Sequence, residues 1–86
     1  MQITDVRIRK VESAGKLRAV ASITFDDEFV VHDIKIIDGA EGAFIAMPSK
    51  QSSDGVYRDV AHPIDTAERE KMQSMILQKF SELEWL

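Results

Sequence analysis

The stretch FVVHDIKIIDGAEGAFIAMPSKQSSDGVYRDVAHP, residues 29–63, decides most of the fold that the sequence predicts. Its apolar run at 29–37 is typical of a strand, and two glycines end that run. Residues 43–47 form a short apolar segment that stops at a proline, and 56–61 predicts one further short strand. Between them the polar segment SKQSSDG, residues 49–55, predicts an exposed and mobile loop. The stretch therefore favours short strands joined by turns.

The strand expected at 29–37 is apolar on both sides near its start. Alternation places its side chains on two faces, which are Val30, His32, Ile34 and Ile36 on one and Phe29, Val31, Asp33 and Lys35 on the other. A strand that is apolar on both faces is central in its sheet, or its second face meets another subunit.

The residues before this stretch predict a β-hairpin. Apolar side chains recur at every second position over 3–10 and 16–25, which is the pattern of two half-buried strands. A turn at Glu12-Ser13-Ala14-Gly15 would join them, and the acidic turn Asp26-Asp27-Glu28 would lead into the third strand.

The residues after the stretch predict a helix that begins at Thr66. Asp65 and Glu68 have the spacing of a capping box, in which the Asp65 carboxylate accepts from the Glu68 amide and the Glu68 side chain reaches back. One apolar stripe follows at three- and four-residue intervals, formed by Met72, Met75, Ile76, Phe80 and Leu83.

These elements predict a single α+β domain over residues 1–86, an antiparallel sheet of about five short strands with one C-terminal helix packed on it. A domain of 86 residues buries little of its surface, and the chain ends on the apolar residues Leu83, Trp85 and Leu86. Unpaired strand edges and an apolar end are most simply hidden in a two-fold interface, which predicts a homodimer.

Composition limits the class of protein. The net charge is −4, yet residues 1–25 carry +3 and residues 26–65 carry −6, so a local basic face is compatible with an acidic chain. There is no cysteine, which excludes disulfides and thiolate metal sites. The opening MQITDVRIRKV lacks the features of a signal peptide and no apolar run reaches membrane-spanning length, so we expect a soluble cytoplasmic protein without a membrane partner.

Residue types that support catalysis are present but do not form a recognisable reaction centre. His32 beside Asp33, and His62 near Asp59, could supply acid–base groups, although hydrogen-bonded histidines at strand positions are the simpler interpretation. Two histidines without helical i, i+4 spacing do not predict a zinc site, and the glycines match no phosphate loop. We therefore expect a non-enzyme with no cofactor, no metal and no small-molecule substrate.

Three groups of basic residues could contact phosphates. They are Arg7, Arg9 and Arg18 on the first two strands, Lys50 and Arg58 at the base of a hairpin, and Arg69, Lys71 and Lys79 on the helix. The alternative for the strand residues is a solvated sheet face with cross-strand ion pairs, and for the helix residues it is pairing with the neighbouring glutamates.

The segments ITDVRIRKV, FVVHDIKIIDG, GAFIAMPSK and YRDVAHPI resemble, in order, the sporulation stage V protein G (SpoVG) family of bacterial septation proteins. The resemblance implies a small cytoplasmic homodimer that binds DNA and RNA and regulates gene expression affecting septation and cell division, and sporulation in spore formers. Carried over by position, it implies that the nucleic-acid contacts are Lys50, Arg58, Arg69 and Lys71. Arg7, Arg9 and Arg18 stay secondary candidates from the strand pattern alone.

A second function stays open at this point. The acidic excess would repel nucleic acid, and the surface formed by FVVHDIKII and AMPSK would then bind a protein partner, which makes the chain an adaptor in septum formation.

Overall fold

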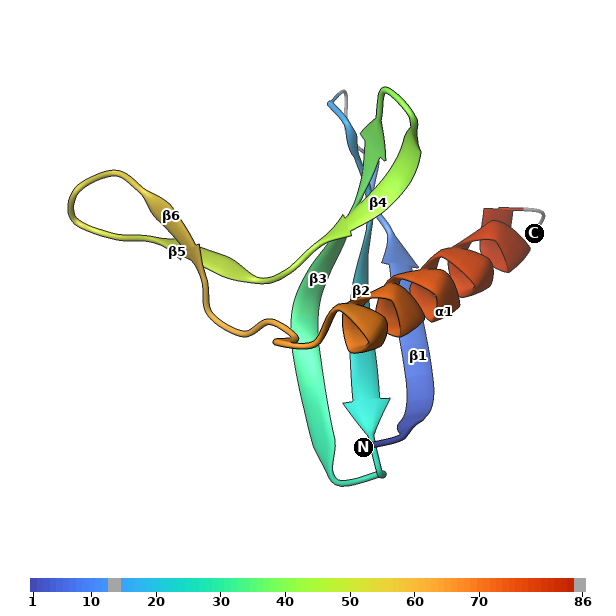
Figure 1. Ribbon diagram of the computed structural model, residues 1–86. Helices are drawn as coiled ribbons and strands as arrows, with labels where there is room; N and C mark the ends of the chain where they lie inside the picture. Colours follow the sequence, from blue (N-terminus) through green and yellow to red (C-terminus); the bar gives the residue numbers. More distant parts are fainter. Residues whose placement is uncertain (13–14, 85–86) are drawn as a thin grey trace.

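The structure is a computed structural model that describes residues 1–12 and 15–84, and it shows an α+β fold. A four-stranded sheet is crossed on one side by a single helix, and a two-stranded ribbon projects from the sheet (Figure 1). The elements are β1 (Ile3–Lys10), β2 (Leu17–Phe25), β3 (Phe29–Gly39), β4 (Gly42–Ala46), β5 (Ser49–Gln51), β6 (Tyr57–Asp59) and α1 (Thr66–Glu84).

The main sheet is an antiparallel meander in the order β1-β2-β3-β4, which confirms the expected sheet and its N-terminal hairpin. Asp26 and Asp27 both have positive φ, 53° and 55°, and Glu28 N–H donates to the Phe25 carbonyl at 3.0 Å. These are the features of a type I′ turn, whose twist matches that of the strands it joins. In the turn predicted between β1 and β2, Ser13 and Ala14 lie outside the described residues.

The strand expected at 56–61 is present as β6, but it belongs to a second, two-stranded sheet and does not extend the main sheet. The segment 49–55 is not simply a loop, because β5 pairs with β6 in a separate two-stranded sheet. All six residues of these two strands are exposed. Ser49–Gln51 and Tyr57–Asp59 lie close in sequence and pair with each other, which leaves the ribbon, here called the arm, extending away from the main sheet (Figure 1).

The faces expected for the residues of β3 before Asp33 are wrong, because the strand contains a bulge. Asp33 has φ 63°, and the β2–β3 register shifts between Ala21 and Ile23. The extra residue changes the phase of alternation, so Val31 packs against the core together with Ile34, whereas Val30 is exposed.

The core lies between the sheet and α1. Its fully buried side chains are Ile23, Ile34, Ile36, Ile45 and Ile76. On the helix, Met72, Ile76 and Phe80 are buried as predicted, but Met75 is 37% exposed and Leu77 packs against the core instead. Trp85 and Leu86, expected to help form a dimer interface, lie outside the described residues.

The predicted helix start is confirmed, with a simpler cap than expected. Asp65 accepts from the Ala67 amide at 2.8 Å, one residue before the expected donor. An N-cap side chain bonds either the second or the third helical amide, so this geometry is ordinary. The reciprocal hydrogen bond, in which the Glu68 side chain would reach back to the start of the helix, is not formed. Glu68 Oε1 is buried and has no hydrogen-bond partner among the described residues.

Candidate nucleic-acid interface

The arm brings two of the predicted contacts together. Lys50 and Arg58 are direct cross-strand partners in the β5–β6 register. Directly opposed residues on one face have Cβ atoms about 5 Å apart, so both cations project from the same face of the arm. The arrangement agrees with the prediction that they face each other across the base of a hairpin.

The turn at the tip of the arm is held by Asp54. Its carboxylate accepts from the Ser52 hydroxyl, from the Val56 amide at 3.0 Å and from the Arg58 guanidinium at 3.3 Å. The Ser52 hydroxyl, the Val56 amide and then Arg58 hold the pKa of Asp54 below its ordinary value, although weak desolvation opposes them. The charge of Arg58 is thus partly balanced, whereas Lys50 forms no ion pair with any described residue.

The helix contributes Arg69 and Lys71, which have different surroundings. The Arg69 guanidinium donates to the Ile45 carbonyl of β4 at 3.5 Å, a long and weak hydrogen bond that draws this side chain toward the sheet. Lys71 is exposed and makes no ion pair among the described residues. Of these two, Lys71 is the better placed to reach a phosphate.

The three secondary candidates, Arg7, Arg9 and Arg18, do not all lie together. Arg7 and Arg9 share the open sheet face, since they pair with Ser22 and Val20 on β2. Arg18 is separate, because a register shift at Leu17 redirects the start of β2. Its guanidinium bonds Asp38 at 2.7 Å and lies 5.7 Å from the centre of the Phe80 ring.

Sequence reasoning missed Lys35 on the open face. Val20 pairs with Arg9 on one side and with Lys35 on the other, so these two cations flank one valine across three strands. Alternation placed Lys35 opposite Ile34 and Ile36, as observed, but it could not place Lys35 on the same face as His32, because the bulge at Asp33 alters the phase. The signal that could have found it is the position of Lys35 between the apolar residues Ile34 and Ile36.

Neither histidine takes part in a cluster that suggests chemistry. His32 Nδ1 lies 3.0 Å from Ser22 Oγ on the open face, and His62 Nδ1 lies 3.1 Å from the Pro63 carbonyl. Within residues 1–12 and 15–84, no three histidine or acidic side chains gather as a metal site would require. His32 has the hydrogen-bonded strand position that the simpler interpretation expected, whereas His62 lies beyond the end of β6 and contacts the carbonyl of the next residue.

Comparison with known proteins assigns the family. The family model of SpoVG matches residues 1–82. The chain belongs to the SpoVG family. Similar SpoVG proteins, each named "Putative septation protein SpoVG", come from Agathobacter rectalis, Lachnospira eligens and Clostridium acetobutylicum.

These relatives are similar over almost their whole length. The Agathobacter protein is 68% identical over 80 residues, covering 93% of this chain and 92% of its own. The Lachnospira protein is 60% identical over 86 residues, covering 100% and 98%. The Clostridium protein is 61% identical over 83 residues, covering 96% and 87%. The SpoVG resemblance of the four quoted segments therefore extends to the full domain.

The helix was also compared with the requirements of a membrane span. In the part of the chain that the structure describes, no helix is both long and apolar enough to cross a bilayer.

Proposed function

We propose that this SpoVG-family protein is a non-catalytic cytoplasmic regulator that binds DNA or RNA and acts on septation, and on sporulation in spore formers. The observation that carries the proposal is the pairing of Lys50 with Arg58 on an exposed, projecting arm. The septation role is supported by the names of its relatives.

The proposed mode of binding is phosphate contact. A two-stranded antiparallel ribbon is narrow enough to enter the major groove of B-DNA, and cations at its base can then reach the backbone. Lys71 and Arg69 at the start of α1 would add contacts, because the segment that leaves β6 runs directly into this helix. The proposed contacts are to phosphates, which carry no sequence information, so we expect little sequence discrimination.

Salt dependence tests phosphate contact directly. Purified protein is titrated against labelled double-stranded DNA and single-stranded RNA over a series of salt concentrations. Affinity should fall steeply with salt, with a log–log slope of about −0.9 per duplex phosphate neutralised and about −0.7 per single-strand phosphate. A folded protein that binds neither probe at low salt would contradict the proposal.

The arm itself is tested by Lys50→Ala combined with Arg58→Ala. Affinity for both probes should fall at least tenfold and the salt slope should become shallower, because two phosphate contacts are lost. The matched control is Lys10→Ala with Lys16→Ala, which removes the same charge from two exposed residues outside the arm. Equal losses in the two double variants would show that only net charge matters.

One observation favours the adaptor as a second candidate. Several apolar side chains around the arm are exposed, including Val60 at 70% and Ile64 at 96%. Exposed apolar residues that lie near one another are typical of protein-binding surfaces. If nucleic-acid binding is absent at every salt concentration while Ile64→Ser abolishes capture of one defined septation protein, the adaptor function replaces the first proposal.

A further inference from the structure

The two edges of the main sheet differ in whether side chains of α1 bond their backbone groups. At the β4 edge, Ile45 N–H donates to Gln73 Oε1 at 3.2 Å and the Ile45 carbonyl accepts from Arg69 at 3.5 Å. Side chains of α1 therefore satisfy the outward-facing backbone groups of Ile45 on the β4 edge.

The β1 edge has no such cover. β1 is the other end strand of the sheet, and nothing in the described part of the chain bonds its outer backbone groups. Val11 N–H donates to the Arg18 carbonyl of β2 at 3.1 Å. Backbone groups alternate between the two sides of an antiparallel strand, so those of Val6, Ile8 and Lys10 face outward.

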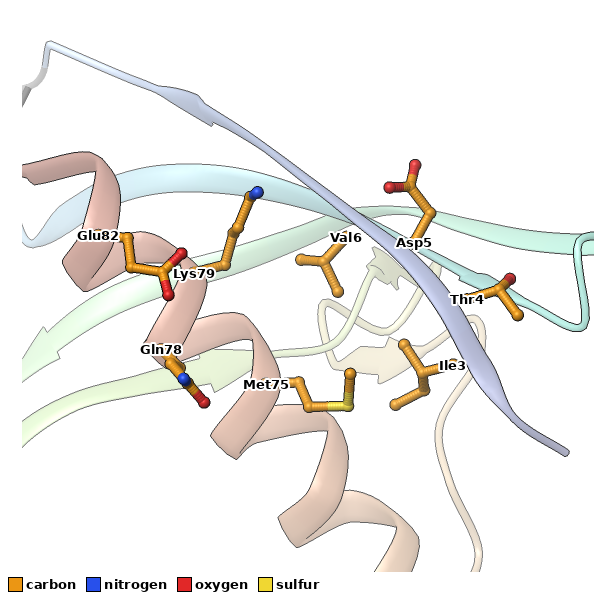
Figure 2. A pocket seen from close by; sticks show the side chains of 8 residues that line it. All are labelled: Ile3, Thr4, Asp5, Val6, Met75, Gln78, Lys79 and Glu82. Atoms are coloured by element: carbon orange, nitrogen blue, oxygen red, sulfur yellow. The ribbon is translucent and has the colours of Figure 1, made fainter.

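A groove runs beside this open edge, between β1 and α1 (Figure 2). It has a volume of about 330 Å³. The side chains of Ile3 and Met75 approach each other at one end, Val6 points between strand and helix, and Lys79 and Glu82 lie at the other end (Figure 2). Met75 is the one apolar helix residue of the predicted stripe that the core leaves 37% exposed, and methionine adapts readily to different partners.

The charges beside the edge indicate what kind of strand would fit. Arg7 and Arg9 lie on the open sheet face, where Arg7 forms an ion pair with Asp5 at 2.9 Å and Arg9 makes none among the described residues. A strand added to β1 would place alternate side chains opposite these arginines, where acidic residues are favoured and basic ones disfavoured. Its other side chains would lie over the groove, where Ile3, Val6 and Met75 offer apolar contacts.

We propose that the β1 edge and the groove against α1 bind an extended protein segment with alternating acidic and apolar residues, which pairs with β1 as an additional strand. Such strand addition draws its affinity from backbone hydrogen bonds and its specificity from pockets for alternate side chains. This site is separate from the arm, so it does not depend on the proposed nucleic-acid function.

The test uses a capped heptapeptide of alternating glutamate and valine as the probe, with ¹⁵N-labelled full-length protein. At saturation, hydrogen exchange of the Val6, Ile8 and Lys10 amides should slow at least tenfold, while the amides of β4 stay unchanged. Two control peptides are alternating lysine and valine, and the glutamate–valine peptide with a central proline. Neither control should protect these amides.

Variants distinguish binding at this site from nonspecific peptide binding. Arg7→Glu with Arg9→Glu should reverse the preference, so that the lysine peptide binds about fivefold or more tighter than the glutamate peptide. Met75→Glu should weaken binding of the glutamate peptide at least tenfold, and its exposed position leaves the core intact. Lys50→Ala with Arg58→Ala should bind the peptide like the unchanged protein.

Three results would overturn the proposal. One is equal binding of the two charged peptides. Another is protection that maps to β4 or the arm. The third is protection of the β1 amides in the free protein that increases with protein concentration, because a second copy would then occupy the edge.

Discussion

At the scale of the residue, Asp33 has the largest effect on the shape of the surface. Its φ of 63° creates the bulge that turns Val31 toward the core and leaves Lys35 on the open face. Left-handed backbone costs an ordinary side chain about 1–2 kcal/mol, and aspartate or glycine tolerates it better. The Asp33 side chain makes no hydrogen bond or ion pair among the described residues.

Substitutions at Asp33 should therefore act through the backbone. Asp33→Gly should unfold at a denaturant midpoint equal to or above that of the unchanged protein, and Asp33→Ala should lose about 1 kcal/mol. Lys35→Ala, on the same strand, is the control and should change stability by less than about 0.5 kcal/mol. Chemical denaturation followed by circular dichroism measures all three. A glycine variant less stable than the alanine variant would contradict the backbone argument.

Residue patterns predicted some contacts and could not predict others. The opposition of Lys50 and Arg58 follows from a short hairpin whose turn residues are visible as Ser-Asp-Gly. The bulge was not predictable by counting every second residue, because one extra residue leaves each half of β3 with a normal pattern. Arg18 was misplaced for the same reason, at the register shift after Leu17.

At the scale of the element, α1 has two tasks, since it covers the core and completes the β4 edge. Gln73→Ala should destabilise the fold by about 1 kcal/mol, because the part-buried Ile45 amide loses its acceptor. Lys71→Ala, two residues earlier and exposed, should change stability by less than about 0.5 kcal/mol. Thermal unfolding of both variants measures the difference. Equal stability of the two would show that water replaces the glutamine.

The arm should loosen in acid. The pKa of Asp54 is lowered from 3.8 in the folded state, chiefly by the Ser52 hydroxyl, so ionised Asp54 stabilises the turn above pH 3.8 and this support is lost as the pH falls through the lowered pKa. Hydrogen exchange of the Val56 amide is followed by NMR from pH 6 downward. Once the pH falls below 3.8, the exchange rate should exceed the rate expected from the intrinsic pH dependence of amide exchange. Asp54→Asn should show no such extra acceleration.

At the scale of the whole molecule, the chain exposes more surface than a compact protein of its mass. Its accessible area is 6238 Å², against about 5,100 Å² expected for 9.7 kDa. Its radius of gyration is 13.2 Å, against about 12 Å for 86 residues. The excess of about 1,100 Å² exceeds the roughly 800 Å² that each partner buries in a standard interface.

We accordingly expect a homodimer, as the sequence suggested. Sedimentation should give twice 9.7 kDa, and the midpoint of thermal unfolding should rise with protein concentration. Ile64→Glu should shift the equilibrium toward the single chain, because it places a charge on the most exposed apolar residue in the described part of the chain. A mass of one chain at every concentration would contradict the expectation.

The α+β class was predictable at this scale and the arrangement of the arm was not. Period-two patterns and an N-cap identify strands and a helix, because both depend on neighbouring residues. Whether a short polar strand joins the main sheet depends on contacts between distant segments, and here β5 and β6 satisfy each other locally.

The order of the elements has a consequence for synthesis on the ribosome. All four strands of the meander are complete at Ala46, and each pairs with the strand made just before it. The groups that satisfy Ile45 belong to Arg69 and Gln73, which are translated later. A nascent chain whose four strands had paired before α1 became available would have both sheet edges bare, and in that state pairing with another nascent chain would compete with correct folding.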